Sequence, residues 1–207
     1  MSKNAMFDLT YGLFVVSVHA DGRDNACITN TVQQVTGVPN RISLTLNKSN
    51  YTHDLLMTNG YFTASIISEA ADFELFRRFG FQSGRDADKF AGFDAVQRTQ
   101  SGTLAVTQGT NSAITARIFH SVDLGTHTIF FADVIEEAVF SDVPSATYAY
   151  YHANIKPKPE AVGTTPDGQT VWRCRICGYE YVGEELPDDF VCPLCKHPAS
   201  DFEKVVK

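Results

Sequence analysis

The stretch WRCRICGYEYVGEELPDDFVCPLCK, residues 172–196, contains two Cys-x-x-Cys pairs separated by fourteen residues, 178–191. Four thiolates at this spacing favour one tetrahedral metal ion, and all-sulfur tetrahedral sites in proteins hold zinc or iron. The sequence therefore predicts a small metal-binding domain in this region. Spacing alone leaves two alternatives open, a structural zinc ribbon and a redox-active iron site.

The residues around the cysteines favour iron. Gly178 follows the second cysteine, where a backbone without a Cβ atom can turn its amides towards sulfur. The pattern W-x-C-x-x-C-G-Y-x-Y, followed by P-x-x-F-x-C-P-x-C, resembles rubredoxin, the one-iron electron carrier, over residues 170–207. Two features depart from that family: the segment between the pairs is short, and Lys196 stands where glycine commonly follows the last cysteine. The resemblance implies a single tetrahedral iron ion with four ligands: Cys174, Cys177, Cys192 and Cys195.

The rest of the chain is long enough for a second domain. The protein has 207 residues, and the segment IKPKPEAVGTTPDGQT, residues 155–170, has three prolines and two glycines and reads as a linker. We therefore expect a front domain at 1–155, a linker at 156–169 and the metal-binding domain at 170–207. Four of the five cysteines stand in the pairs, which fits metal binding in a reducing compartment better than a disulfide framework.

Charge and hydropathy exclude two classes of partner. The chain has 17 basic and 24 acidic residues and no basic stripe, so binding of nucleic acid through its phosphates has little support. The N-terminal MSKNAMFDLTYG lacks the features of a secretory signal, and no apolar run approaches the roughly 20 residues that span a bilayer. We expect a cytoplasmic protein that binds no membrane.

The front domain shows mainly strand patterns. Short apolar or alternating runs, rich in β-branched and aromatic residues, occur at 13–19, 41–47, 61–68, 113–122 and 127–140. Gly125 can supply the turn between the last two runs. Two helical segments interrupt the strands: NYTHDLLMTN at 50–59, and DFELFRRFG at 72–80 with Asp72 as N-cap. The predicted fold is a β-barrel with helical insertions.

One strand-to-helix corner has the residues of a phosphate site. The sequence lacks the dinucleotide fingerprint G-x-G-x-x-G and the phosphate loop G-x-x-x-x-G-K-[ST]. In LTLNKSNYTHDLL, residues 44–56, an alternating strand runs into a short helix whose N-terminal amides and dipole favour an anion. An ordinary helix cap beside a solvated lysine is the alternative. The side chains offered for a phosphate at this corner are Asn47, Lys48, Ser49 and Thr52.

A second polar stretch, DNACITNTVQQVT at 24–36, has the length of two strands but more amides and hydroxyls than a packed sheet needs. Together with YGLFVVSV before it and NKSNYTHDLL after it, this stretch resembles the flavin-reductase-like FMN-binding split-barrel family, whose members are homodimers. The resemblance extends over residues 5–155 and implies that the corner takes the FMN phosphate. It also implies that the flavin ring lies along Asn25, Ala26, Cys27, Ile28, Thr29, Asn30 and Thr31.

His127 is a further candidate by this resemblance. The family often has Gly-Asp-His before the corresponding strand, and here Thr126 replaces the aspartate. His127 would lie near the flavin face and the nicotinamide, although a single strand histidine is often structural. Cys27 alone reads as a small buried side chain. Arg77, Arg78 and Arg85 could either place a nicotinamide nucleotide or be solvated surface charges.

The order of the two domains resembles the high-molecular-weight rubredoxins. This implies an enzyme in which NAD(P)H reduces FMN, FMN reduces the iron, and the iron passes electrons to a flavodiiron protein that reduces oxygen or nitric oxide. Two alternatives stay open. One is an NAD(P)H:flavin reductase with a structural zinc ribbon, and the other is a passive electron adaptor reduced by a separate reductase.

Overall fold

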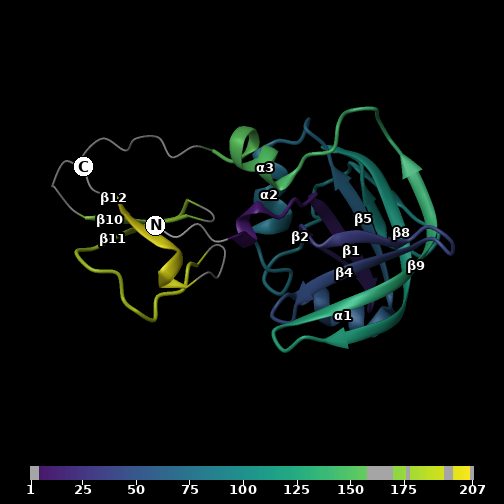
Figure 1. The fold of residues 1–207 in the computed structure, drawn as a ribbon, viewed down its shortest axis with the longest axis horizontal. Coiled ribbons are helices and arrows are strands. Elements are labelled where there is room, and N and C mark those ends of the chain that lie inside the picture. The colour runs from purple at the N-terminus through teal and green to yellow at the C-terminus, as the bar shows by residue number, and fades with distance from the viewer. Residues whose placement is uncertain (1–4, 158–169, 176–177, 194–197, 206–207) are drawn as a thin grey trace. The chain divides into compact units, whose positions relative to one another are not determined.

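The computed structural model describes residues 5–157, 170–175, 178–193 and 198–205, and the chain divides into two compact units, Met1–Lys156 and Pro157–Lys207 (Figure 1). Most of the predicted linker and two of the four paired cysteines, Cys177 and Cys195, lie outside the described residues. No helix in the described ranges is long and apolar enough to cross a membrane.

A seven-stranded antiparallel sheet forms the first unit, which confirms the predicted mainly β fold. Its spatial order is β2-β1-β5-β8-β9-β4-β3. The strands are β1 (Phe14–Ala20), β2 (Arg23–Thr29), β3 (Val32–Thr36), β4 (Arg41–Asn47), β5 (Tyr61–Ile67), β8 (Thr110–Asp123) and β9 (His127–Val139). A separate two-stranded hairpin is made of β6 (Val96–Arg98) and β7 (Leu104–Val106).

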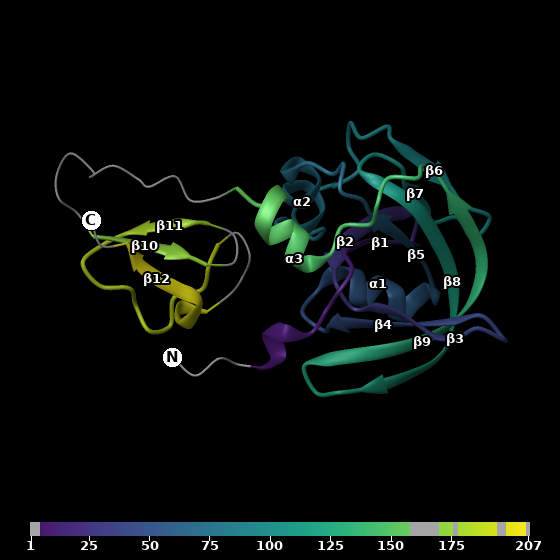
Figure 2. The same ribbon diagram turned by 45° about the horizontal axis from the view of Figure 1, so that its top comes forward.

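The two edges of this sheet are joined by only two residues of chain. Strands β2 and β3 are consecutive in sequence, yet they occupy opposite ends of the strand order. Between them, the Thr31 hydroxyl donates a 2.6 Å hydrogen bond to the Thr45 carbonyl of β4. The sheet must therefore curl until its edges approach, and Figure 2 shows the curled strands around α1. The stretch 24–36 forms two strands that do not pair with each other.

Two helices pack on different faces of the curled sheet. Helix α1 (Tyr51–Asn59) begins where the Asn50 side chain accepts from the Thr52 amide, and its buried leucines join the core inside the barrel. Helix α2 (Phe73–Gly80) begins at Asp72, whose side chain accepts from the Leu75 amide at 3.1 Å, as predicted. Its apolar side packs with Val15 and Ala26 in a second core.

Short helical turns complete the first unit. They are η1 (Ala5–Asp8), α3 (Tyr148–Tyr150) and η2 (Tyr151–Ile155). The Tyr151 ring stacks on Phe76 of α2 with centroids 4.3 Å apart, which assigns a packing role to this tyrosine. Figure 1 shows α3 beside α2.

The second unit has a three-stranded antiparallel sheet in the order β11-β10-β12. Its elements are β10 (Val171–Cys174), β11 (Glu180–Val182), η3 (Ala199–Asp201) and β12 (Phe202–Val205). The Trp172 indole donates to the Gly183 carbonyl at 3.2 Å, while Arg173 pairs with Glu180 at 2.5 Å. This small sheet holds the first cysteine at the end of β10.

Candidate functional site

Two of the four predicted metal ligands are described, and both lie in one core. Cys174 and Cys192 are 1% and 0% exposed. They share a cluster with five aromatic residues: Trp172, Tyr179, Tyr181, Phe190 and Phe202. The fold of this short segment thus brings two soft sulfur donors into one buried cluster, which suits zinc or iron.

The turn after the first cysteine pair has the geometry expected of a metal-binding knuckle. Gly178 has φ +82°, a value that side chains with a Cβ atom rarely adopt. Its amide donates to the Cys174 carbonyl at 2.9 Å, and the Cys174 amide donates to the Tyr179 carbonyl at 2.8 Å. These bonds fix the backbone on both sides of Cys174, so the structure fits an ion held by sulfur.

In the first unit, the outer edge of β2 offers unpaired backbone groups. Within the described residues, β2 pairs only with β1, so one edge of the strand faces no other strand. The Ala26 carbonyl accepts a hydrogen bond from the Lys89 side chain, so the backbone N–H and C=O of Ala26 point to the outer edge of β2. Because alternate residues of an antiparallel strand share an edge, Ile28 points the same way. The outer amides of Ala26 and Ile28 can therefore donate to a ring edge.

The neighbouring side chains of β2 face inward. Asn25 is 2% exposed and donates to the Thr52 hydroxyl of α1 at 2.9 Å. Cys27 lies in the barrel core, and burial raises the pKa of its thiol although nearby Thr52, Asn50 and Lys89 act in the opposite direction. Asn25 and Cys27 thus hold β2 against α1, and their side chains are not presented at the outer edge of the strand.

The loop after α2 closes on the same place. An added Cβ atom at Gly84 would lie 2.0 Å from the Asn25 side-chain oxygen and 3.0 Å from a ring carbon of Tyr51. Only glycine permits this approach. The Arg85 guanidinium lies 4.9 Å from the Tyr51 ring centroid and pairs with Asp54, so strand β2, α1 and this loop meet at one corner.

At the predicted phosphate corner the polar groups bind one another. Lys48 pairs with Asp123 of β8 at 2.5 Å, and the Asn47 side chain accepts from both the amide and the hydroxyl of Ser49 at 2.9 Å. These side chains are partly or largely exposed, so an entering phosphate can replace their contacts. Thr52 differs, because it is fully buried and holds Asn25. Thr52 accepts this bond, so its hydroxyl could still donate to a phosphate, but the burial of its side chain keeps it from an entering ligand.

The histidines and arginines have intramolecular partners. His127 is paired with Asn47 across β9 and β4, so it lies beside the phosphate corner. His53 of α1 contacts the Thr128 hydroxyl of β9 at 2.9 Å. Arg77 pairs with Glu74, and Arg78 donates to the carbonyls of Lys89 and Ala91. Arg77 and its partner nevertheless remain exposed to solvent, whereas Arg78 is partly buried.

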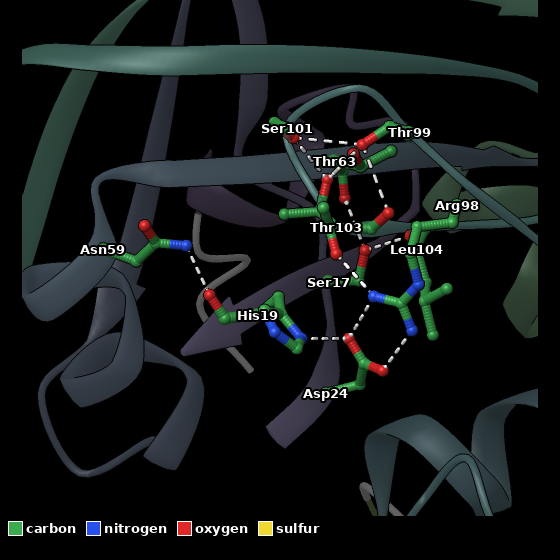
Figure 3. Close-up of polar contacts among 11 residues, drawn as sticks. Ser17, His19, Asp24, Asn59, Thr63, Arg98, Thr99, Ser101, Thr103 and Leu104 are labelled. Carbon is green, nitrogen blue, oxygen red and sulfur yellow. Dashed lines mark hydrogen bonds and ion pairs between the residues drawn. The ribbon is translucent and has the colours of Figure 1, made fainter. Parts of the chain in front are cut away.

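The start of β2 is fixed from its other side (Figure 3). Asp24 accepts from Arg98 at 2.7 and 3.1 Å and lies 2.8 Å from the His19 ring nitrogen. Burial alone would raise the pKa of Asp24, but the bonds from Arg98 and His19 outweigh it and hold the pKa below its ordinary value. Beneath this group, the hydroxyls of Thr63 and Thr103 are 2.6 Å apart. Because Asp24 and Asn25 are adjacent and point to opposite faces, these bonds and that of Asn25 to Thr52 anchor β2 on both faces.

Comparison with known proteins assigns both units. Residues 6–158 match the family model described as flavin reductase like domain, and residues 172–203 match the rubrerythrin, rubredoxin-like domain. The chain belongs to the flavin-reductase-like family and continues into a rubredoxin-like domain. It is 32% identical to the high molecular weight rubredoxin of Moorella thermoacetica, covering 99% of this chain and 100% of the relative. The same two-domain organisation confirms the predicted family.

Two further proteins bear on the first domain. A ferric-chelate reductase (NAD(P)H) of Archaeoglobus fulgidus is 34% identical and covers 83% of this chain and 98% of its own length. The crystal structure of an FMN-binding protein from Thermus thermophilus has a TM-score of 0.58 at 21% identity, covering 66% of this chain and 74% of its own. The structural likeness confirms the fold of the flavin-reductase-like domain.

Two residues that lie against β2 were not predicted from the sequence. Lys89 stands in DADKF, where a lysine among charged residues reads as solvated, and Gly84 stands in a loop like any other glycine. The flanking Phe90 and Phe93 were the one available signal, since aromatic neighbours favour a partly buried lysine stem.

Proposed function

We propose that the protein carries electrons from NAD(P)H through bound FMN to one iron ion, and then singly to an acceptor protein of the flavodiiron class. The observation that carries this proposal is the presence of both domains in one chain, with similarity to a high molecular weight rubredoxin along its whole length. An isolated flavin reductase needs no thiolate site of this kind.

The first domain would hold FMN along β2. When bound, FMN supplies the exchange between a two-electron hydride donor and a one-electron acceptor. The outer amides of Ala26 and Ile28 would donate to the ring, while Asn25 and Thr52 position the strand from within. Asn47, Lys48 and Ser49 at the start of α1 would bind the phosphate, and His127 would stand beside them.

The second domain would bind the iron through Cys174, Cys177, Cys192 and Cys195. Support comes from the burial of the first and third of these and from the glycine turn at 178. We further propose a homodimer in the cytoplasm, in keeping with the family's barrels and with paired cysteines that require a reducing compartment.

The proposal is tested on the full-length protein under anaerobic conditions by visible spectroscopy and metal analysis, before and after adding NADH or NADPH. We expect FMN and ferric-thiolate absorption that both bleach. Zinc in place of iron after iron-replete expression would leave a flavin reductase with a structural ribbon. Iron that bleaches only with an added reductase would indicate a passive adaptor.

A second candidate is reduction of ferric chelates by the first domain, favoured by the 34% identity to a ferric-chelate reductase over 83% of the chain. This activity would not need the cysteine site. A full-length Cys174→Ser, Cys192→Ser variant should keep it if the candidate holds, while transfer to an acceptor protein should be lost.

A further inference from the structure

A buried lysine side chain binds the outer edge of β2. Lys89 is 4% exposed, and its ammonium donates to the Ala26 carbonyl at 2.8 Å and to the Phe79 carbonyl at 3.0 Å. The first acceptor lies in the middle of β2 and the second near the end of α2. One side chain thus ties the strand to the helix.

The charge of Lys89 is costly where it stands. Burial lowers the pKa of its ammonium, and both of its hydrogen-bond acceptors are neutral carbonyls. Lys89 lines a polar cavity of about 360 Å³ together with the carboxylates of Glu74 and Asp88. No ion pair of Lys89 occurs among the described residues. An apolar residue would avoid the cost of desolvating a cation but would leave the Ala26 and Phe79 carbonyls without this donor, so packing alone does not account for a lysine.

The Lys89 ammonium lies at the outer edge of β2, where a ligand would bind. Ala26 presents its carbonyl to Lys89 and, on the same edge, its amide to any ligand along β2. A ligand that accepts a hydrogen bond from the Ala26 amide therefore lies next to the Ala26 carbonyl, which is bonded to Lys89. A cation here stabilises negative charge in such a ligand more than it stabilises a neutral form.

We propose that Lys89 is a positioning residue for flavin, which holds the outer edge of β2 in place and favours the reduced, anionic form of the ring over the oxidised form. This inference rests on the proposed function and adds a residue to it. Lys89 acts through the Ala26 peptide and through its charge, and it takes no part in proton transfer.

The test compares binding of oxidised and reduced FMN by full-length variants, titrated anaerobically. Lys89→Met should raise the Kd of reduced FMN about tenfold more than the Kd of oxidised FMN, the size expected for one charge at a partly screened site. Lys89→Arg, which keeps the charge, should leave the ratio of the two values within about threefold of the parent.

Arg77→Met is the matched control, because Arg77 lines the same cavity but is exposed and paired with Glu74. It should leave the ratio unchanged. A ratio unchanged in Lys89→Met would overturn the inference, even if both Kd values rise together as a merely structural loss would cause. If the methionine variant does not fold, Lys89→Gln is compared with Lys89→Arg, and equal ratios in those two would overturn it. Absence of FMN binding by the unaltered protein would instead overturn the proposed function.

Discussion

The two candidate centres of this chain differ in what builds them. In the second domain the predicted ligands are side-chain sulfurs, and two of them, Cys174 and Cys192, are buried in a small aromatic core. In the first domain the candidate flavin site is the outer edge of β2, where backbone groups point outward. Side chains such as Asn25 hold the strand in place and do not form that edge.

This difference predicts different responses to substitution. A tetrahedral ion that loses one of four ligands loses much of its affinity at once, and the small domain loses the ion that stabilises its fold. Only a substitution to proline removes a backbone amide hydrogen. Other substitutions should lower the affinity for a ring bound by backbone amides only by displacing the strand. Single changes in the first domain should therefore have graded effects.

The largest effect is expected for Cys192→Ser. Serine replaces a thiolate with a hydroxyl that stays protonated at neutral pH and does not reproduce the all-sulfur site, so bound iron should fall to less than about a tenth of the parent value. Iron content and the ferric-thiolate absorption measure this. FMN content and its reduction by NADH should remain unchanged, and loss of FMN in this variant would contradict the independence of the two domains.

Gly84→Ala should come next. The added methyl group would meet the Asn25 side chain at 2.0 to 2.6 Å, so Asn25 must leave its bond with Thr52 and β2 should shift. We expect about a tenfold rise in the Kd of FMN and a loss of about 1–3 kcal/mol in stability.

Gly37→Ala is the control for this variant, since an added Cβ atom there meets nothing within 4 Å and its φ is not positive. FMN titration and thermal denaturation of both variants compare them. Equal affinity in the two would show that the strand edge does not depend on Asn25.

Lys48→Ala tests the predicted phosphate corner of the first domain. We expect FMN affinity to fall by about tenfold, while riboflavin, which has no phosphate, should change by less than about twofold. Isothermal titration with both ligands measures this. Asp123→Asn, which releases Lys48 from its ion pair, should not weaken FMN. Equal weakening of FMN and riboflavin by Lys48→Ala would remove lysine from the phosphate site.

The smallest effect concerns the anchor at the start of β2. The pKa of Asp24 is lowered in the folded state, so its contribution is present above the ordinary carboxyl value and is lost as pH falls through the folded value. Asp24→Asn should cost about 1 kcal/mol at pH 7, or a few degrees in Tm, and the deficit should shrink towards pH 3.

Asp21→Asn serves as its control, because Asp21 is exposed in the adjoining β1–β2 turn and has left-handed φ, which asparagine tolerates. Thermal denaturation between pH 3 and 7 compares the two. A deficit of Asp24→Asn that stays constant over this range would contradict the role of its charge.

Local chemistry made much of the fold predictable. The cap at Asp72, the turn at Gly125 with φ +85° and the strand at 41–47 each depend on a few adjacent residues, and the structure has all three. The cysteine pairs likewise indicate a metal site through spacing that lies within one short segment. These features need no knowledge of distant contacts.

The arrangement of the candidate flavin site could not be predicted from local chemistry. That β2 and β3 lie at opposite ends of the sheet follows from pairings with β1 and β4, which no local pattern in 24–36 specifies. The contact of Lys89 with Ala26 spans 63 residues, and the close approach of Gly84 to Asn25 depends on the same packing. Such contacts are decided by tertiary structure.

If electrons reach the iron through FMN, as proposed, rapid mixing with NADH will show the two centres reduced in sequence. In the full-length protein, followed anaerobically at wavelengths that separate the two chromophores, ferric-thiolate absorption should bleach only as FMN is reduced. Protein stripped of FMN should keep its iron oxidised until FMN is restored. Iron that bleaches equally fast without FMN, or that stays oxidised beside fully reduced FMN, would contradict the account.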